Sequence, residues 1–124
     1  MDKNSREAIA NNVKRLMDHH GHNQTALAKK SGVSQRTISN VIRPDSAGSL
    51  TLESMDAIAR AYGLQTWHIM LPNAPLELLV NSSLEKLVDN YMYATREGRD
   101  MITRVSVREA EIAYERESKK AAGG

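Results

Sequence analysis

The stretch QTALAKKSGVSQRTISNV, residues 24–41, decides the fold of this chain. Two short segments with helical spacing of apolar residues meet there at Gly32. Ala28 suits a close crossing of two helices, and Gly32 permits the positive φ angle of a tight turn at no steric cost. The positions expected to point inward are Leu27, Val33, Ile38 and Val41. The stretch therefore predicts two helices that meet at a sharp angle through a short turn.

Polar residues at the start of the second helix are left on its outer face once the apolar positions are used for packing. Gln and Asn side chains can pair with N6 and N7 of adenine in the major groove of DNA, and Arg can pair with O6 and N7 of guanine. Recognition helices present their N-terminal residues to base edges. We therefore predict a set of base-reading residues: Ser34, Gln35, Arg36, Ser39 and Asn40.

Free backbone N–H groups at the N-terminus of the first helix suit the binding of a phosphate. Gln24 stands at that end, after the predicted helix cap Asn23. Arg43 follows at the far end of the second helix, and Lys29 adds positive charge, although Lys29 and Lys30 are equally typical of a solvated pair. The predicted phosphate contacts are Asn23, Gln24, Lys29 and Arg43.

The distribution of charge agrees with a polyanionic partner at one end of the chain. The 124 residues carry a formal net charge of +2, yet residues 1–43 hold eight Lys and Arg against three Asp and Glu. The rest of the chain holds nine basic and twelve acidic residues. This asymmetry is typical of nucleic-acid binding, and a solvated charged surface is the alternative.

Several classes of protein are not expected from the composition. The chain has no cysteine, which argues against a secreted disulfide framework, and its N-terminus lacks the apolar segment of a signal peptide. No apolar run approaches the roughly 18 residues of a membrane span. We expect a cytoplasmic protein with no membrane partner.

Helical periodicity dominates the N-terminal part, and no alternating strand pattern of useful length is present. Asn4 and Glu7 predict a capping box before an apolar face made by Ile9, Val13, Leu16 and Met17. Thr51 predicts the start of a fourth helix whose apolar face holds Leu52, Met55, Ile58, Ala59 and Tyr62. A short fifth helix is expected over residues 66–71, with Trp67 in the core rather than stacked on a base.

Two prolines bracket LPNAP, residues 71–75, and predict a domain boundary there. Ser82 and Glu85 predict the capping box of a further helix, and Gly98 predicts a turn over residues 95–100 before a last helix. We therefore expect a first domain over residues 1–75, a helical hairpin over residues 76–118 and a disordered tail over residues 119–124.

Each helix of the expected hairpin has one apolar stripe, and a lone hairpin cannot bury both stripes. Burial against a second copy is favourable at roughly 25 cal/mol per Å² of apolar surface. The predicted dimerisation residues are Leu84, Leu87, Val88, Tyr91, Met92, Ile102, Val105 and Ile112. Folding of the hairpin back onto the N-terminal helices is the alternative.

The segment NQTALAKKSGVSQRTISNVI resembles the helix-turn-helix of lambda repressor and Cro proteins, the Xre-type regulators. TLESMDAIARAYGL resembles the next helix of that family, so the likeness covers residues 5–71. The resemblance implies an all-α fold, with a five-helix DNA-binding bundle followed by a C-terminal helical hairpin. It also implies that Gln24 and Arg43 bind the DNA backbone, that bases are read from the second helix, and that dimers bind palindromic operators.

These features predict a sequence-specific DNA-binding repressor of phage or prophage type that acts as a homodimer on double-stranded DNA. The alternative is an antitoxin or adaptor whose C-terminal helices bind another protein. No nucleophile has an adjacent base and no acid pair has a clear separation on one face, so we expect neither catalysis nor a cofactor. His19, His20 and His22 favour a solvated helix end over a metal site.

Overall fold

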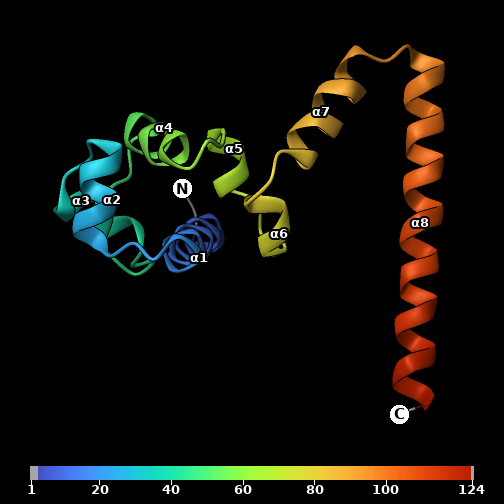
Figure 1. Ribbon diagram of the computed structural model, residues 1–124, viewed down its shortest axis with the longest axis horizontal. Helices are drawn as coiled ribbons and strands as arrows, with labels where there is room; N and C mark the ends of the chain where they lie inside the picture. The colour runs from blue at the N-terminus through green and yellow to red at the C-terminus, as the bar shows by residue number, and fades with distance from the viewer. Residues whose placement is uncertain (1–2, 124) are drawn as a thin grey trace. The chain divides into compact units, whose positions relative to one another are not determined.

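The computed structural model describes residues 3–123, and within that range it contains eight helices and no strand (Figure 1). The predicted all-α class is confirmed. Two compact units make up the chain, the first ending at Ser82 and the second beginning at Ser83. Among the described helices, none combines the length and the apolar character that crossing a membrane requires.

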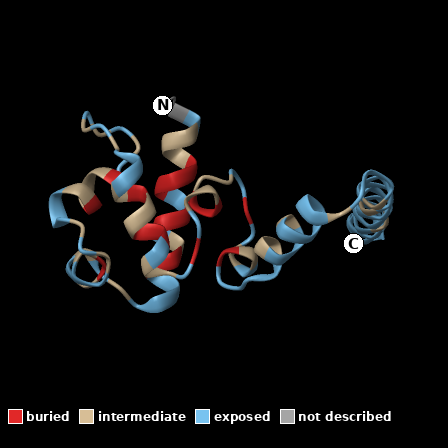
Figure 2. Cartoon of the chain, turned by 90° about the horizontal axis from the view of Figure 1, so that it is seen from above, coloured by how far each residue is buried: buried red, intermediate tan, exposed pale blue. Residues whose placement is uncertain are grey.

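The first unit contains six helices, one more than predicted. They are α1 (Lys3–His20), α2 (Gln24–Ser31), α3 (Gln35–Val41), α4 (Leu52–Ala61), α5 (Thr66–Ile69) and α6 (Leu76–Leu79). Figure 2 shows the buried residues gathered on the inward sides of these helices, many of them along α1. The large buried side chains include Ile9, Val13, Leu16, Leu27, Ile38, Val41, Met55, Ile58, Ile69 and Leu79.

Helix α1 buries the predicted apolar face, but its start differs from the prediction. Asn4 lies inside the helix, because α1 already includes Lys3, so Asn4 is not its N-cap residue. The helix ends at His20, and Gly21 follows with a φ angle of 67°, a left-handed conformation that favours glycine.

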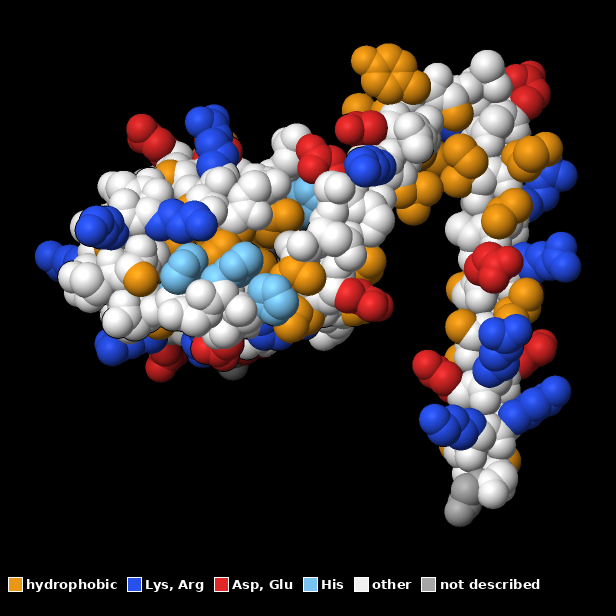
Figure 3. Space-filling view, in the orientation of Figure 1, with side chains coloured by type: hydrophobic (Ala, Val, Ile, Leu, Met, Phe, Trp, Pro, Cys, Tyr) orange, Lys and Arg blue, Asp and Glu red, His pale blue; other side chains and the backbone are white. Residues whose placement is uncertain are grey.

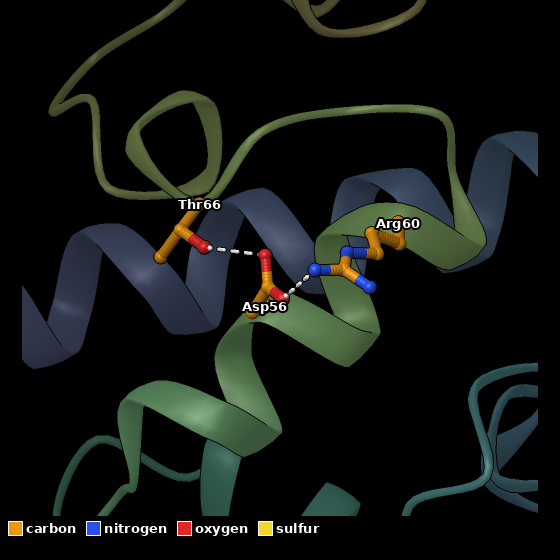
Figure 4. A network of polar contacts seen from close by, with 3 residues as sticks. All are labelled: Asp56, Arg60 and Thr66. Carbon is orange, nitrogen blue, oxygen red and sulfur yellow. Dashed lines mark hydrogen bonds and ion pairs between the residues drawn. The ribbon is translucent and has the colours of Figure 1, made fainter.

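Helix α4 begins where predicted, since the Thr51 side chain accepts a hydrogen bond from the backbone N–H of Ser54 at 3.1 Å. The prediction that Leu52 belongs to its apolar face is wrong. Leu52 is 69% exposed, because it stands in the first turn before the helix meets the core. Farther along, Asp56 accepts a hydrogen bond from Thr66 at 3.3 Å, which links α4 to α5, and it also pairs with Arg60 of its own helix at 2.7 Å (Figure 4).

The segment after α4 differs most from the prediction. Helix α5 ends at Ile69 rather than at residue 71, and Trp67 is only half-buried, with its ring stacked on the buried His68 at 3.7 Å. The unpredicted α6 packs on α1, and its Leu79 is 1% exposed. The first unit therefore extends to Ser82, beyond the boundary expected at residue 75.

The second unit consists of α7 (Ser83–Tyr93) and α8 (Arg96–Gly123). The predicted turn around Gly98 is wrong. The Thr95 hydroxyl accepts a hydrogen bond from the backbone N–H of Gly98 at 3.1 Å, which satisfies a free donor and lets α8 begin at Arg96. Disorder was expected from residue 119, but α8 remains helical as far as Gly123, and Gly124 lies outside the described residues.

Candidate nucleic-acid interface

Side-chain caps and one glycine define the turn between α2 and α3. Asn23 caps α2 by accepting a hydrogen bond from the N–H of Ala26 at 2.8 Å. Gly32 ends α2 with a φ angle of 77°, and its N–H donates to the carbonyl oxygen of Ala28 at 2.9 Å. Ser34 then caps α3 by accepting from the N–H of Thr37 at 3.2 Å. These local bonds confirm the predicted helix, turn and helix.

Packing determines which face of α3 is left outside. Ile38 and Val41 are fully buried, as is Leu27 on α2, while Ala28 and Val33 are half-buried against the same core. Because successive helical residues are rotated by about 100°, two buried positions three residues apart direct the opposite side of α3 away from the core.

The predicted base-reading residues fall into two groups. Ser34, Gln35 and Arg36 are exposed at the N-terminal turn of α3. Ser39 is half-buried. Asn40 is half-buried too, and its Oδ1 accepts a hydrogen bond from the Ser46 hydroxyl at 3.0 Å. The side chain of Asn40 is therefore engaged with the loop after α3, whereas Gln35 and Arg36 face solvent.

The predicted phosphate contacts lie at both ends of the helix pair. Gln24 is the first residue of α2 and is half-buried, and Asn23 before it uses its side chain as the cap. Lys29 and Arg43 are exposed. Gln24 thus stands at the N-terminus of α2, and Arg43 follows the C-terminal end of α3.

Sequence reasoning missed a residue that contacts this region from α1. The Nη2 atom of Arg6 donates to the carbonyl oxygen of Asn40 at 3.2 Å and to that of Arg43 at 3.4 Å. Nothing in the periodicity of α1 indicates this contact, because its partners lie more than 30 residues farther along the chain.

The three neighbouring histidines form an aromatic cluster with Tyr62. The His20 ring stacks on Tyr62 with centroids 5.0 Å apart, and Nδ1 of His22 lies 3.0 Å from the Tyr62 hydroxyl. In Figure 3 the histidine side chains gather in one patch of the first unit. Among the described residues, no group of three or more His, Cys, Asp or Glu side chains is arranged to hold a metal ion.

Burial and charge shift the pKa values in this cluster. Desolvation lowers the pKa of His20 below its ordinary value, and His19, His22 and Lys30 lower it further by repelling a positive ring. Burial raises the pKa of Tyr62 to about 12, because the phenolate would be poorly solvated. Both shifts favour the neutral forms of His20 and Tyr62.

The predicted dimerisation residues lie on two helices that bury no side chain among the described residues. Four are half-buried, namely Leu84, Val88, Ile102 and Ile112. Four are exposed, namely Leu87, Tyr91, Met92 and Val105. Figure 3 shows apolar side chains on the surface of both helices, between charged residues of both signs on α8.

A family model described as helix-turn-helix matches residues 13–66. No curated protein and no solved structure matches the chain. The matched segment runs from Val13 in α1 to Thr66 at the start of α5, so it contains the whole of α2, the turn and α3. The resemblance predicted from the sequence is confirmed. Residues 13–66 therefore carry the DNA-binding helix-turn-helix of the Xre and lambda-repressor-like family of transcription regulators.

Proposed function

We propose that this protein is a sequence-specific transcriptional repressor, of the phage or prophage type that its sequence resembles, which binds a palindromic operator as a homodimer. The observation that carries the proposal is the exposed N-terminal turn of α3, where Gln35 and Arg36 stand free of the core. Both side chains can make paired hydrogen bonds to base edges in the major groove. Occupation of an operator would block transcription from an overlapping promoter.

Backbone contacts complete this mode of binding. The N-terminus of α2 offers unbonded N–H groups and the positive end of the helix dipole to one phosphate. Arg43 offers a full positive charge to another, beyond the end of α3. Such contacts orient the reading helix, while the bases determine the choice of sequence.

Self-association is supported by the proportions of the second unit. Helix α7 has 11 residues and α8 has 28, so at 1.5 Å per residue they span about 16 and 42 Å. The shorter helix cannot cover the apolar residues of the distal half of α8. Helices gain most of their stability from packing an apolar face, so we propose that a second copy of the chain covers the apolar face of α8. The two helix-turn-helix units of such a dimer would bind two half-sites of the operator. Binding to the second half-site would cost less orientational freedom than binding to the first.

An antitoxin or adaptor role is the second candidate. The exposed apolar residues of α7 and α8 can equally bind an unrelated protein, and Tyr93 and Tyr114 are 93% and 74% exposed. Co-purification with a different protein in a fixed ratio, together with a monomeric state of the purified chain, would favour this role.

Selection of random duplex DNA by the purified full-length protein tests the leading proposal. The selection is run at about 150 mM salt, where non-specific phosphate binding is weakened. We expect enrichment of an inverted repeat whose half-site centres lie about one helical turn, or a multiple of it, apart. Failure to enrich any sequence would contradict a self-sufficient operator binder. Enrichment of a single half-site without a repeat would contradict the proposed dimer but not sequence-specific binding.

A further inference from the structure

The loop over residues 42–51 joins α3 to α4 and is held mainly by hydrogen bonds rather than by apolar packing. Ile42 and Leu50, near its two ends, pack against the core from half-buried positions, whereas Ala47 and Ser49 between them are exposed. Within the loop, the N–H of Ser46 donates to the carbonyl oxygen of Arg43 at 3.0 Å. The segment between these two anchors has no apolar side chain in the core, so it depends on its polar contacts for a single conformation.

Arg6 of α1 supplies the contacts on one side of this loop. Its Nη1 donates to the carbonyl oxygen of Gly48 at 2.9 Å, and its Nη2 donates to those of Asn40 and Arg43 at 3.2 and 3.4 Å. The planar fork of a guanidinium allows two nitrogens to hold separate carbonyls, which a single lysine nitrogen cannot reproduce. A positive charge at the C-terminal end of α3 is also favoured by the helix dipole.

Asn40 supplies the contact on the other side. Its Oδ1 accepts from the Ser46 hydroxyl at 3.0 Å, and the same hydroxyl oxygen accepts from the N–H of Gly48 at 3.2 Å. A Cβ atom added to Gly48 would lie 2.6 Å from Nδ2 of Asn40. The side chain of Asn40 thus fills the space beside Gly48, and the loop is held between Asn40 and Arg6.

We propose that Arg6 is a positioning residue for DNA recognition, which holds the end of α3 and the loop so that Arg43 meets a phosphate. This inference rests on the proposed DNA-binding function. Arg43 is exposed at its side chain, while its carbonyl oxygen is bonded to Arg6 and to the N–H of Ser46. The backbone of Arg43 is therefore held in place, while its positively charged side chain is exposed and can contact a phosphate. Arg6 lies outside the segment that matches the helix-turn-helix family, so this support comes from a part of the chain beyond that match.

Three variants test the proposal on the full-length protein and its selected operator. Arg6→Lys keeps the charge but loses the fork, Gly48→Ala displaces Asn40, and Ser46→Ala removes the bond to Asn40. Ser49→Ala is the matched control, because Ser49 is an exposed serine of the same loop. Affinity is measured by fluorescence anisotropy between about 50 and 200 mM salt, at a temperature where circular dichroism shows each variant to be folded.

We expect Arg6→Lys and Gly48→Ala to lose about tenfold in affinity, and Ser46→Ala less, while Ser49→Ala stays at the wild-type value. The salt dependence of the affinity for DNA is the decisive measurement. The slope of log affinity against log salt should become shallower by about one in Gly48→Ala, as expected for the loss of one phosphate contact. Gly48→Ala changes no charge, so a changed slope requires that another cation has moved away from the DNA.

Wild-type affinity and slope in folded Arg6→Lys and Gly48→Ala would overturn the proposal. A loss of affinity with an unchanged slope would overturn it as well, because Arg43 would then have kept its contact. If Arg6→Lys does not fold, Gly48→Ala and Ser46→Ala decide by the same criteria. A wild-type protein that selects no DNA would instead contradict the proposed function, so the two failures are distinguishable.

Discussion

Asn12 and Ile69 lie 57 residues apart in the sequence, yet Nδ2 of Asn12 donates a hydrogen bond to the carbonyl oxygen of Ile69 at 2.9 Å. The same Nδ2 donates to the carbonyl oxygen of Leu71 at 2.8 Å, and Oδ1 accepts from Arg15 at 2.7 Å. Asn12 is 1% exposed. One buried amide on α1 therefore satisfies the main chain where α5 ends, and it fixes the path that leads to α6.

Replacement of Asn12 by alanine should destabilise the first unit. Two carbonyl oxygens would lose their donor, and the free energy of unfolding should fall by about 2–4 kcal/mol. The adjacent Asn11 is exposed, so Asn11→Ala is the matched control and should change stability by about 0.5 kcal/mol or less. Urea unfolding followed by circular dichroism measures both. Equal losses in the two variants would show that the buried contacts contribute nothing.

The base-reading role of α3 predicts a loss of specificity from single substitutions. Gln35→Ala or Arg36→Ala should cost about 1–3 kcal/mol on the selected operator and relax the choice of base at one position in each half-site. Binding to random duplex DNA should change little, because the phosphate contacts remain. Titration of both DNAs checks this expectation, and equal losses on the two would refute base reading.

The phosphate-binding role of the helix ends predicts the opposite pattern. Gln24→Ala and Arg43→Ala should weaken binding to operator and random DNA alike, because phosphates carry no sequence information. Only Arg43→Ala removes a charge, so only this variant should reduce the salt slope by about one. An unchanged slope for Arg43→Ala would remove Arg43 from the phosphate contacts.

The proposed dimer predicts different effects for two valines of α8. Val105 and Val107 are 54% and 51% exposed, and a separation of two residues places them on nearly opposite faces of the helix. Val105→Glu should convert the dimer to a monomer, because a charge would enter the buried seam. Val107→Glu should leave the dimer intact. Analytical ultracentrifugation measures the mass of each variant, and a monomer from Val107→Glu with a dimer from Val105→Glu would reverse the assignment of the face.

The lowered pKa of His20 predicts a dependence of stability on pH. His20 faces Tyr62 and lies near His19, His22 and Lys30, and the folded chain holds its proton less tightly than the unfolded chain. The contribution of neutral His20 to the stability of the fold is therefore fully present above the ordinary pKa of 6.5. It is lost as the pH falls through the lower pKa of His20 in the folded chain. His20→Gln should reduce the fall in melting temperature between about pH 7.5 and 5, a window that brackets that ordinary pKa. An identical fall in wild type and variant would contradict this account.

Most helices of the first unit could be located from the sequence because their signals are local. Asn23, Ser34 and Thr51 each accept a hydrogen bond from a backbone N–H three residues ahead, and Gly32 forms the left-handed turn at its own position. Such caps need no information from distant parts of the chain. The exposed Gln35 and Arg36 followed from the same periodicity, since buried positions on a short helix define the opposite face.

Other features could not be predicted because their partners are remote in sequence. Leu52 satisfied the helical period yet lies outside the core. Helix α6 belongs to the first unit, although its residues follow the boundary that two prolines had indicated, because Leu79 is buried in the core. The hydrogen bond from the Ser46 hydroxyl to Asn40 was likewise not predicted, because it depends on the path of the following loop.

The sequence by itself determined the local elements of this protein, namely the caps, the glycine turn and the apolar faces that select helices, since each depends on residues within a few positions of one another. Only the tertiary structure decided the roles of Arg6, Asn12 and Asn40. Their contacts join atoms of segments that approach only when the shared apolar core is buried, and that approach is not encoded in the spacing of any one segment.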